Sequence, residues 1–221
     1  MQPDGAQGAE LAGYEHGGAL CRRSAWLVPE RVTDVTVPAR DNRTLLLIVD
    51  MLSDYSFPDA EQLLENAERP ARHIRQARDA ADTAGVHVVY ANDLHGLWGG
   101  SREQVCERAL NGRRPDLVTP LLPRPGDAFM HKGQHSAFYG TPLPHLLHEE
   151  QIEEVVLAGQ VTEQCILYTA LDAHVRHYAI TVLRDAVIAL DRELGEAALR
   201  MMSRNMSARV LTTRQWHNEI A

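Results

Sequence analysis

Short apolar runs alternate with longer amphipathic stretches along most of the chain, and this alternation constrains the fold more than any other feature. The runs are nearly continuous in Val, Leu and Ile, which is typical of strands buried on both faces between helices. The expected strands are residues 44–50, 86–93, 127–132, 153–159, 178–185 and 208–213, and the expected helices are residues 60–84, 144–149, 163–175 and 190–202. The sequence therefore predicts an α/β fold, a three-layer α/β/α sandwich around a six-stranded, mainly parallel sheet with the Rossmann-like order 3-2-1-4-5-6.

The first part of the chain differs from the rest because it is rich in Gly, Ala and Glu and has no sustained apolar period. We interpret residues 1–40 as an N-terminal arm, either flexible or laid across a neighbour, and residues 41–221 as one domain. The formal net charge of −8 is spread along the chain, which argues against nucleic acid or an anionic membrane as a partner. No stretch is typical of a membrane span or a secretory signal, so we expect a cytoplasmic protein that binds a small molecule.

Polar residues stand at the carboxyl ends of the expected strands, where open parallel sheets bind their ligands. Asp50 follows the apolar run TLLLIV, and Lys132 ends the run DAFMHK. Lys132 is also the only lysine in the chain, and the pKa of a lysine can be moved, whereas arginine stays protonated. The alternatives are that Asp50 only caps a turn and that biased codon usage left one lysine by chance. Asp185 ends another expected strand, and we assign it a structural role.

The segment LAGQVTEQCILYTAL places Cys165 near the expected start of a helix, where the pKa of a thiol can shift. A strand is expected to end at Gly159, with Thr162 as the N-cap of a helix and Cys165 in its first turn. The helix dipole is then expected to lower the pKa of the thiol and to raise its thiolate fraction. The wide spacing of the cysteines predicts neither a disulfide framework nor a zinc site, and we interpret Cys21 and Cys106 as buried apolar side chains.

Asp50, Lys132 and Cys165 at three strand ends of one sheet suit acyl transfer to cysteine followed by hydrolysis. Asp50 would take the thiol proton and return it to a leaving amine, while Lys132 stabilises the thiolate and the carboxylate. Backbone N–H groups at the helix start would hold the oxyanion. A cysteine phosphatase is excluded because Leu171 stands where it needs an arginine, and a thioredoxin-like role is excluded because CxxC is absent.

The chain resembles the isochorismatase-like cysteine hydrolases, a family that includes nicotinamidases, carbamoylsarcosine and ureidoacrylate amidases and isochorismatases. Three motifs carry the resemblance, which runs from about Thr44 to Thr213. LLLIVDMLSDYSF matches a DMQ-type motif, with Leu52 where a glutamine is common. KGQHSAFYGT matches the segment after the family lysine, and GQVTEQC matches the G-x-x-T-x-x-C turn of the nucleophile.

The resemblance implies a catalytic triad of Asp50, Lys132 and Cys165. It also implies a cis peptide bond between Gln160 and Val161, which would turn the Val161 N–H toward the oxyanion together with that of Cys165. A homo-oligomer, dimer or tetramer, is expected as well.

The stretch NDLH, residues 92–95, offers half of the Asp-x-His metal site of nicotinamidases, but the second histidine does not follow. We therefore expect no metal and no cofactor. The run YANDLHGLW resembles instead an Asn-Asp stretch followed by Trp in a less characterised branch of the family. This places Asn92 and Trp98 at the wall of the substrate pocket, with Phe138 and Tyr139 as further liners. The alternative for each of these four is core or loop packing.

The leading hypothesis is a hydrolase that cleaves an amide or related C–N bond through a thioester on Cys165. One rival is hydrolysis of an isochorismate-type vinyl ether, in which Asp50 acts as the acid and no cysteine is needed. Another rival is a noncatalytic binding or scaffold protein that retains the fold.

Overall fold

The computed structural model describes residues 42–93, 96 and 99–221, so the expected N-terminal arm and Trp98 lie outside the described residues. Within them, six parallel strands form one sheet in the order β3-β2-β1-β4-β5-β6. The predicted fold class and strand order are therefore confirmed. The strands are β1 (Thr44–Val49), β2 (His87–Asp93), β3 (Ala128–Lys132), β4 (Glu154–Gln160), β5 (Ala179–Ile188) and β6 (Arg209–Leu211).

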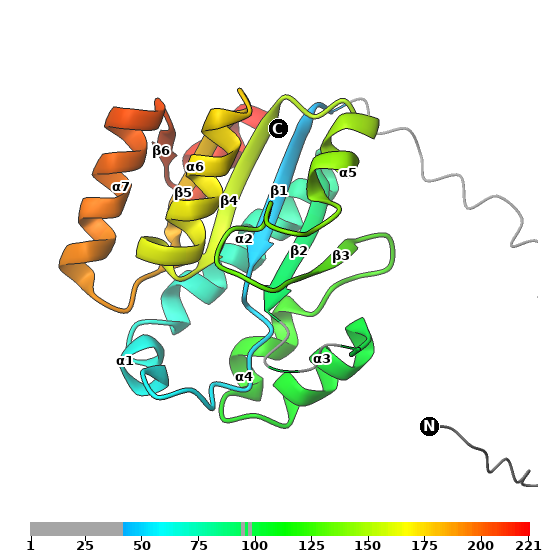
Figure 1. Cartoon of the computed structure of the whole chain (residues 1–221), viewed down its shortest axis with the longest axis vertical. Helices are drawn as coiled ribbons and strands as arrows, with labels where there is room; N and C mark the ends of the chain where they lie inside the picture. Colours follow the sequence, from blue (N-terminus) through cyan, green and yellow to red (C-terminus); the bar gives the residue numbers. More distant parts are fainter. Residues whose placement is uncertain (1–41, 94–95, 97–98) are drawn as a thin grey trace, which may run out of the picture. The chain divides into compact units, whose positions relative to one another are not determined.

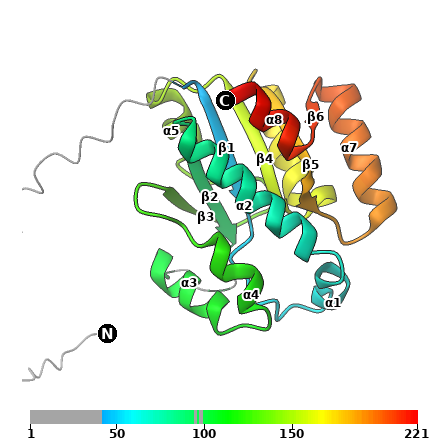
Figure 2. The ribbon, with the colours of Figure 1, turned by 180° about the vertical axis from the view of Figure 1, so that it is seen from behind.

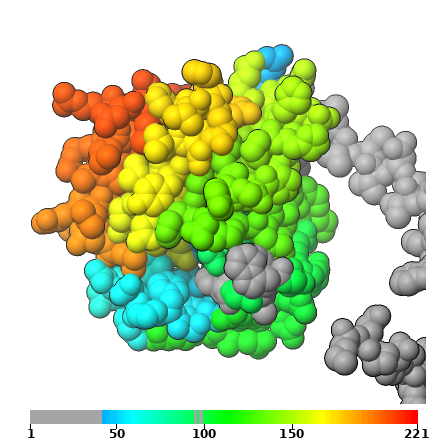
Figure 3. Space-filling view, viewed as in Figure 1, coloured from blue at the N-terminus to red at the C-terminus, as the bar shows by residue number. Residues whose placement is uncertain are grey.

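Helices cover both faces of the sheet (Figures 1 and 2). One face carries α5 (Leu143–Glu149), α6 (Leu167–Val175) and α7 (Arg192–Met206), which form much of the surface in the space-filling view (Figure 3). The other face carries α2 (Glu68–Thr83) and α8 (Thr213–Ile220). The arrowheads of β1 and β2 in Figure 1 point toward α1 (Ala60–Leu64), α3 (Arg102–Leu110) and α4 (Pro115–Val118).

The central strand β1 is buried on both sides, as its unbroken apolar run predicts. Leu46 and Ile48 pack into the core on one face of the sheet, while Leu45, Leu47 and Val49 pack into the core on the other. All five side chains have no exposed surface. This double burial fixes the backbone at the carboxyl end of β1, where the functional residues begin.

The expected helix at residues 60–84 is two helices, because α1 ends at Leu64 and α2 starts at Glu68. Pro70 explains the break, since proline has no N–H to donate and is tolerated only in the first turn of a helix. It lies in the first turn of α2. Three further helices, α3, α4 and α8, were not expected from the apolar pattern. In the described part of the chain no helix is both long and apolar enough to cross a membrane.

Candidate active site

The carboxyl ends of four neighbouring strands bring the predicted site residues together. In the sheet register, Val49 of β1 pairs with Ala91 of β2 and with Gly159 of β4, and Lys132 of β3 pairs with Asp93 of β2. The strand β2 thus separates the strands that lead to Asp50 and Lys132. Only a long side chain on β3 can reach past the end of β2.

Lys132 makes this reach and contacts both of the other predicted catalytic groups. Its Nζ lies 2.7 Å from Asp50 Oδ2 and donates to Cys165 Sγ at 3.5 Å. A third hydrogen bond from the same ammonium goes to the carbonyl of Gln134 at 3.3 Å. Lys132 is 1% exposed, Cys165 8% and Asp50 9%, so the cluster is buried and only Asp50 and Cys165 keep a small area in contact with solvent. The structure therefore brings together Asp50, Lys132 and Cys165.

Asp50 is held in an unusual backbone conformation by its neighbours. Its φ of 56° lies in the left-handed region, which is unfavourable for a residue with a side chain. From β2, the carbonyl of Ala91 accepts the Asp50 N–H at 3.0 Å, and the N–H of Asp93 donates to Asp50 Oδ1 at 2.8 Å. From β4, the side chain of Gln160 donates to the Asp50 carbonyl at 2.6 Å. The carboxylate is thus oriented by contacts on both sides of β1.

The charges in this cluster shift one another's pKa values. Burial raises the pKa of Asp50, although the neighbouring Lys132 ammonium acts in the opposite direction. Burial is the largest single effect on Lys132 and disfavours its charged form, but the charge and hydrogen bond of Asp50 and the charges of Cys165 and Asp93 together outweigh it and raise the pKa of the lysine. A lysine whose pKa is raised remains an ammonium at neutral pH. A carboxyl group whose pKa is raised is better suited to accept and release a proton.

The surroundings of Cys165 differ from the expectation in two ways. The N-cap is Val161 rather than Thr162, and Cys165 lies in a single π-helical turn, Thr162–Ile166, that continues into α6. Burial, followed by the charge of Asp50, raises the pKa of the thiol to about 12, so the expectation of a lowered pKa is wrong. The partial charge of a helix start is small compared with the cost of charging a buried sulfur. In the resting state the thiol is therefore protonated.

The Gln160–Val161 peptide bond is cis. A hydrogen bond from the Val161 N–H is among the effects that act against the raised pKa of Cys165, which places this N–H beside the sulfur. The role of the Val161 and Cys165 N–H groups as an oxyanion hole stays a prediction.

The expected pocket residues lie in three different settings. Asn92 is 1% exposed, and its side chain bonds to the backbone of Leu52 at 2.9 and 3.0 Å and to the Asp93 carbonyl. Phe138 is a core residue with the guanidinium of Arg176 over its ring at 4.9 Å, whereas Tyr139 is 65% exposed. Asn92 thus holds the turn after Asp50, and contact of Asn92, Phe138 or Tyr139 with substrate stays a prediction. Trp98 and the metal-site histidine, His95, lie outside the described residues.

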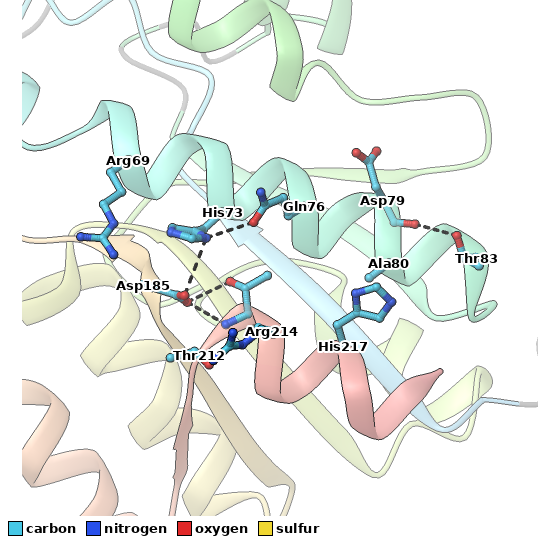
Figure 4. A pocket seen from close by; sticks show the side chains of 11 residues that line it. Arg69, His73, Gln76, Asp79, Ala80, Thr83, Asp185, Thr212, Arg214 and His217 are labelled. Atoms are coloured by element: carbon cyan, nitrogen blue, oxygen red, sulfur yellow. Dashed lines mark hydrogen bonds and ion pairs between the residues drawn. The ribbon is translucent and has the colours of Figure 1, made fainter.

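Asp185 does not face the triad. The strand β5 continues to Ile188, past the expected end, after an irregularity in its pairing with β4. The Asp185 carboxylate accepts hydrogen bonds from the Thr213 N–H at 2.8 Å and the Thr213 hydroxyl at 2.9 Å, and lies 3.7 Å from His73 Nδ1. It thus anchors the start of α8 at a cavity of about 700 Å³ between α2 and α8 (Figure 4), which none of the triad residues line. The expected structural role fits these contacts.

Sequence reasoning missed a buried ion pair at the start of β3. The guanidinium of Arg78 on α2 donates to both oxygens of Asp127, at 2.8 and 2.6 Å, and both side chains are 2% exposed. Asp127 also accepts the N–H of Arg124 at 2.6 Å. Because β3 begins at the next residue, this pair fixes the strand whose other end carries Lys132.

The fold and motifs have counterparts among known proteins. The Isochorismatase domain model matches residues 44–215. The chain is 35% identical over 170 residues to the isochorismatase family protein YaaI of Bacillus subtilis, covering 77% of this chain and 94% of that protein. It is 32% identical over 201 residues to ureidoacrylate amidohydrolase RutB of Methylorubrum extorquens, covering 75% of this chain and 81% of that protein.

Among solved structures, N-carbamoylsarcosine amidase from Thermoplasma acidophilum superposes with a TM-score of 0.60 at 27% identity, over 77% of this chain and 96% of that one. The family match spans all six strands and every residue of the cluster around Lys132. The chain therefore belongs to the isochorismatase family, as its motifs predicted.

Proposed function

We propose that this isochorismatase-family hydrolase cleaves an amide or related C–N bond of a small molecule through a thioester on Cys165. The observation that carries the proposal is that the Lys132 ammonium contacts both the Asp50 carboxylate and the Cys165 thiol. Lys132 Nζ lies 2.7 Å from Asp50 Oδ2 and 3.5 Å from Cys165 Sγ. The similarity to RutB and to N-carbamoylsarcosine amidase, both named for amide substrates, supports a C–N bond as the target.

The raised pKa of Cys165 decides how the first step runs. A protonated thiol is a poor nucleophile, so its proton must leave as the sulfur attacks. Asp50 and Cys165 shift each other's pKa, and the carboxylate of Asp50 is the base that takes this proton. The S–C bond forms, the carbonyl oxygen becomes an oxyanion, and the ammonium of Lys132 offsets the negative charge that moves through the site.

Asp50 then returns the same proton to the nitrogen of the leaving group. The C–N bond breaks, an amine or ammonia departs, and the acyl group remains on Cys165 as a thioester. A water molecule attacks this thioester while Asp50 takes one of its protons. The C–S bond breaks, the proton passes from Asp50 to the sulfur, and the acid product leaves with the resting thiol restored.

The test is a screen of small amides and carbamoyl compounds in which the intact protein is weighed by mass spectrometry during turnover. We expect an acyl adduct that digestion locates on Cys165, and release of the amine that the adduct implies. Cys165→Ala should form no adduct and should lose at least ~1,000-fold in rate, because members of one catalytic unit fail together. Full turnover by Cys165→Ala would contradict covalent catalysis, and with a vinyl ether substrate it would favour Asp50 acting alone as the acid.

A further inference from the structure

Gln160, the last residue of β4, reaches from the segment before Cys165 to the backbone of Asp50. Its side chain donates to the Asp50 carbonyl at 2.6 Å and is 3% exposed. The preceding Gly159 makes this reach possible, because a Cβ there would lie 2.1 Å from the carbonyl oxygen of Val49. Only glycine lets the two backbones approach so closely. The amide of Gln160 therefore lies directly beside the residue that follows β1.

Asp50 needs such a contact because its backbone conformation decides where its carboxylate points. A φ of 56° costs about 1 kcal/mol for a residue other than glycine. Without a holding contact the residue relaxes toward ordinary backbone angles, and the Cα–Cβ direction turns with it. The strand β2 holds the N–H and the carboxylate of Asp50, whereas Gln160 holds the carbonyl from β4.

Gln160 is buried, and a low local dielectric strengthens its hydrogen bond. Tyr55 is fully buried beside it. Burial raises the pKa of Tyr55 to about 12, and the Gln160 side chain acts against this rise. The contact that fixes the Gln160 amide is its hydrogen bond to the Asp50 carbonyl.

We propose that Gln160 is a positioning residue, which sets the Asp50 carboxylate against the Cys165 sulfur by tying the turn at Asp50 to the turn that carries the nucleophile. Only four residues separate Gln160 from Cys165 along the chain, so the tie is short. The inference rests on the proposed function, in which Asp50 takes the thiol proton. It adds that the geometry of this transfer is controlled from β4.

The test is a double-mutant cycle on the reactivity of the thiol, without any substrate. The rate constant for alkylation of Cys165 by iodoacetamide at pH 8 follows the thiolate fraction, because this pH lies far below a pKa of about 12. The rate is measured by peptide mass spectrometry for wild type, Gln160→Met, Asp50→Asn and the double variant. Gln160→Met keeps the length of the side chain and removes its donor.

When Asp50 is loosened, its negative charge moves away from the Cys165 sulfur and raises the pKa of the thiol less. Gln160→Met should therefore speed alkylation at least ~3-fold in the wild-type background, which corresponds to about half a pKa unit. In the Asp50→Asn background the same change should alter the rate less than ~1.5-fold, because the group through which Gln160 acts is already gone. Gln160→Asn, which keeps the amide but shortens its reach, should behave like Gln160→Met and replaces it if that variant does not fold.

Two controls accompany the cycle. Gln62→Met removes a hydrogen bond of the same kind at the surface, from Gln62 Nε2 to the Leu190 carbonyl at 2.8 Å, and should leave the rate unchanged. Alkylation of Cys106 in the same samples reports general loosening.

An unchanged alkylation rate of Cys165 in Gln160→Met overturns the proposal. An equal rise in the wild-type and Asp50→Asn backgrounds also overturns it, because such a rise means only that solvent enters the site. If Asp50→Asn alone has no effect, Gln160 has no route to the thiol and the proposal also fails. If the amide screen finds no substrate but the four alkylation rates follow the expected pattern, the proposed hydrolase function fails and the positioning role of Gln160 stands.

Discussion

The ammonium of Lys132 lies 2.7 Å from the Asp50 carboxylate although a whole strand, β2, separates the strands that carry them. The contact exists because β3 ends level with Asp93 and the lysine side chain is long enough to pass the end of β2. Both groups are nearly inaccessible to solvent, so neither charge could be left without the other.

Lys132→Arg should abolish most activity without unfolding the protein. The arginine retains the charge, but its planar fork needs more room than a site where the lysine is 1% exposed offers. We expect hydrolysis to fall on the order of 1,000-fold, once a substrate is in hand. Circular dichroism and thermal melting would show that the fold persists. Activity within a few-fold of wild type would mean that the site needs only a positive charge.

The alkylation rate of Cys165 should rise about tenfold per pH unit from pH 6 to pH 9 and show no plateau. A thiol whose pKa is raised to about 12 is roughly one part in ten thousand thiolate at pH 8, and this fraction grows with every unit of pH. Iodoacetamide labelling followed by peptide mass spectrometry measures the profile. A plateau below pH 8 would mean that the helix start, rather than burial, governs the thiol.

Asp50→Asn should separate reactivity from catalysis. The Asp50 charge is the second cause, after burial, of the raised pKa of Cys165, so its loss lowers that pKa and speeds alkylation at pH 8. Hydrolysis should nevertheless fall at least ~1,000-fold, because no group remains to move the proton to the leaving nitrogen. Parallel measurements of the alkylation rate and kcat decide the matter. Loss of both together would argue that Asp50 is needed for the shape of the site instead.

Gly159→Ala should destabilise the protein by at least about 3 kcal/mol. The new Cβ would lie 2.1 Å from the Val49 carbonyl oxygen, and the φ of 120° at Gly159 is strained for any side chain. Urea unfolding measures the loss. Gly99→Ala is the matched control, because no described residue lies within 4 Å of a Cβ there, and it should stay within ~0.5 kcal/mol of wild type.

Asp127→Asn should cost about 3 kcal/mol of stability, because it leaves the Arg78 guanidinium buried without its full counter-charge. Both side chains of this pair are 2% exposed. Asp116→Asn, at an ion pair with Arg114 that is open to solvent, should cost less than ~1 kcal/mol. Equal losses at the two sites would contradict the burial argument.

The sequence predicted the positions of Asp50, Lys132 and Cys165 because each closes or follows a run of buried strand residues, and parallel strands end at one edge of the sheet. It did not predict the pKa of Cys165, because a helix start is visible in a sequence whereas the depth of burial is not. Gln160 was missed for a related reason. A polar residue at the end of the run EEVVLAGQ is an available signal, but its partner is a backbone carbonyl 110 residues away.

Two of the three unexpected helices, α3 and α8, did carry a local signal. Ser101 and Gln104 begin α3 with a capping box, and Thr212 and Gln215 begin α8 in the same way. The pattern of Ser or Thr followed three residues later by Gln or Glu is readable from the amino-acid sequence alone. The apolar period of these helices is weaker, since few of their side chains are buried. A search for caps would have found both.

Because Lys132 is the only lysine and is buried, proteolysis can measure the motion of the sheet edge that carries it. A lysine-specific protease has one bond to cut in this sequence, after Lys132, and it must take that side chain into its own specificity pocket. With the side chain 1% exposed, cleavage requires the edge of the sheet to open first. The rate at which two fragments accumulate under native conditions thus measures how often the edge of the sheet opens.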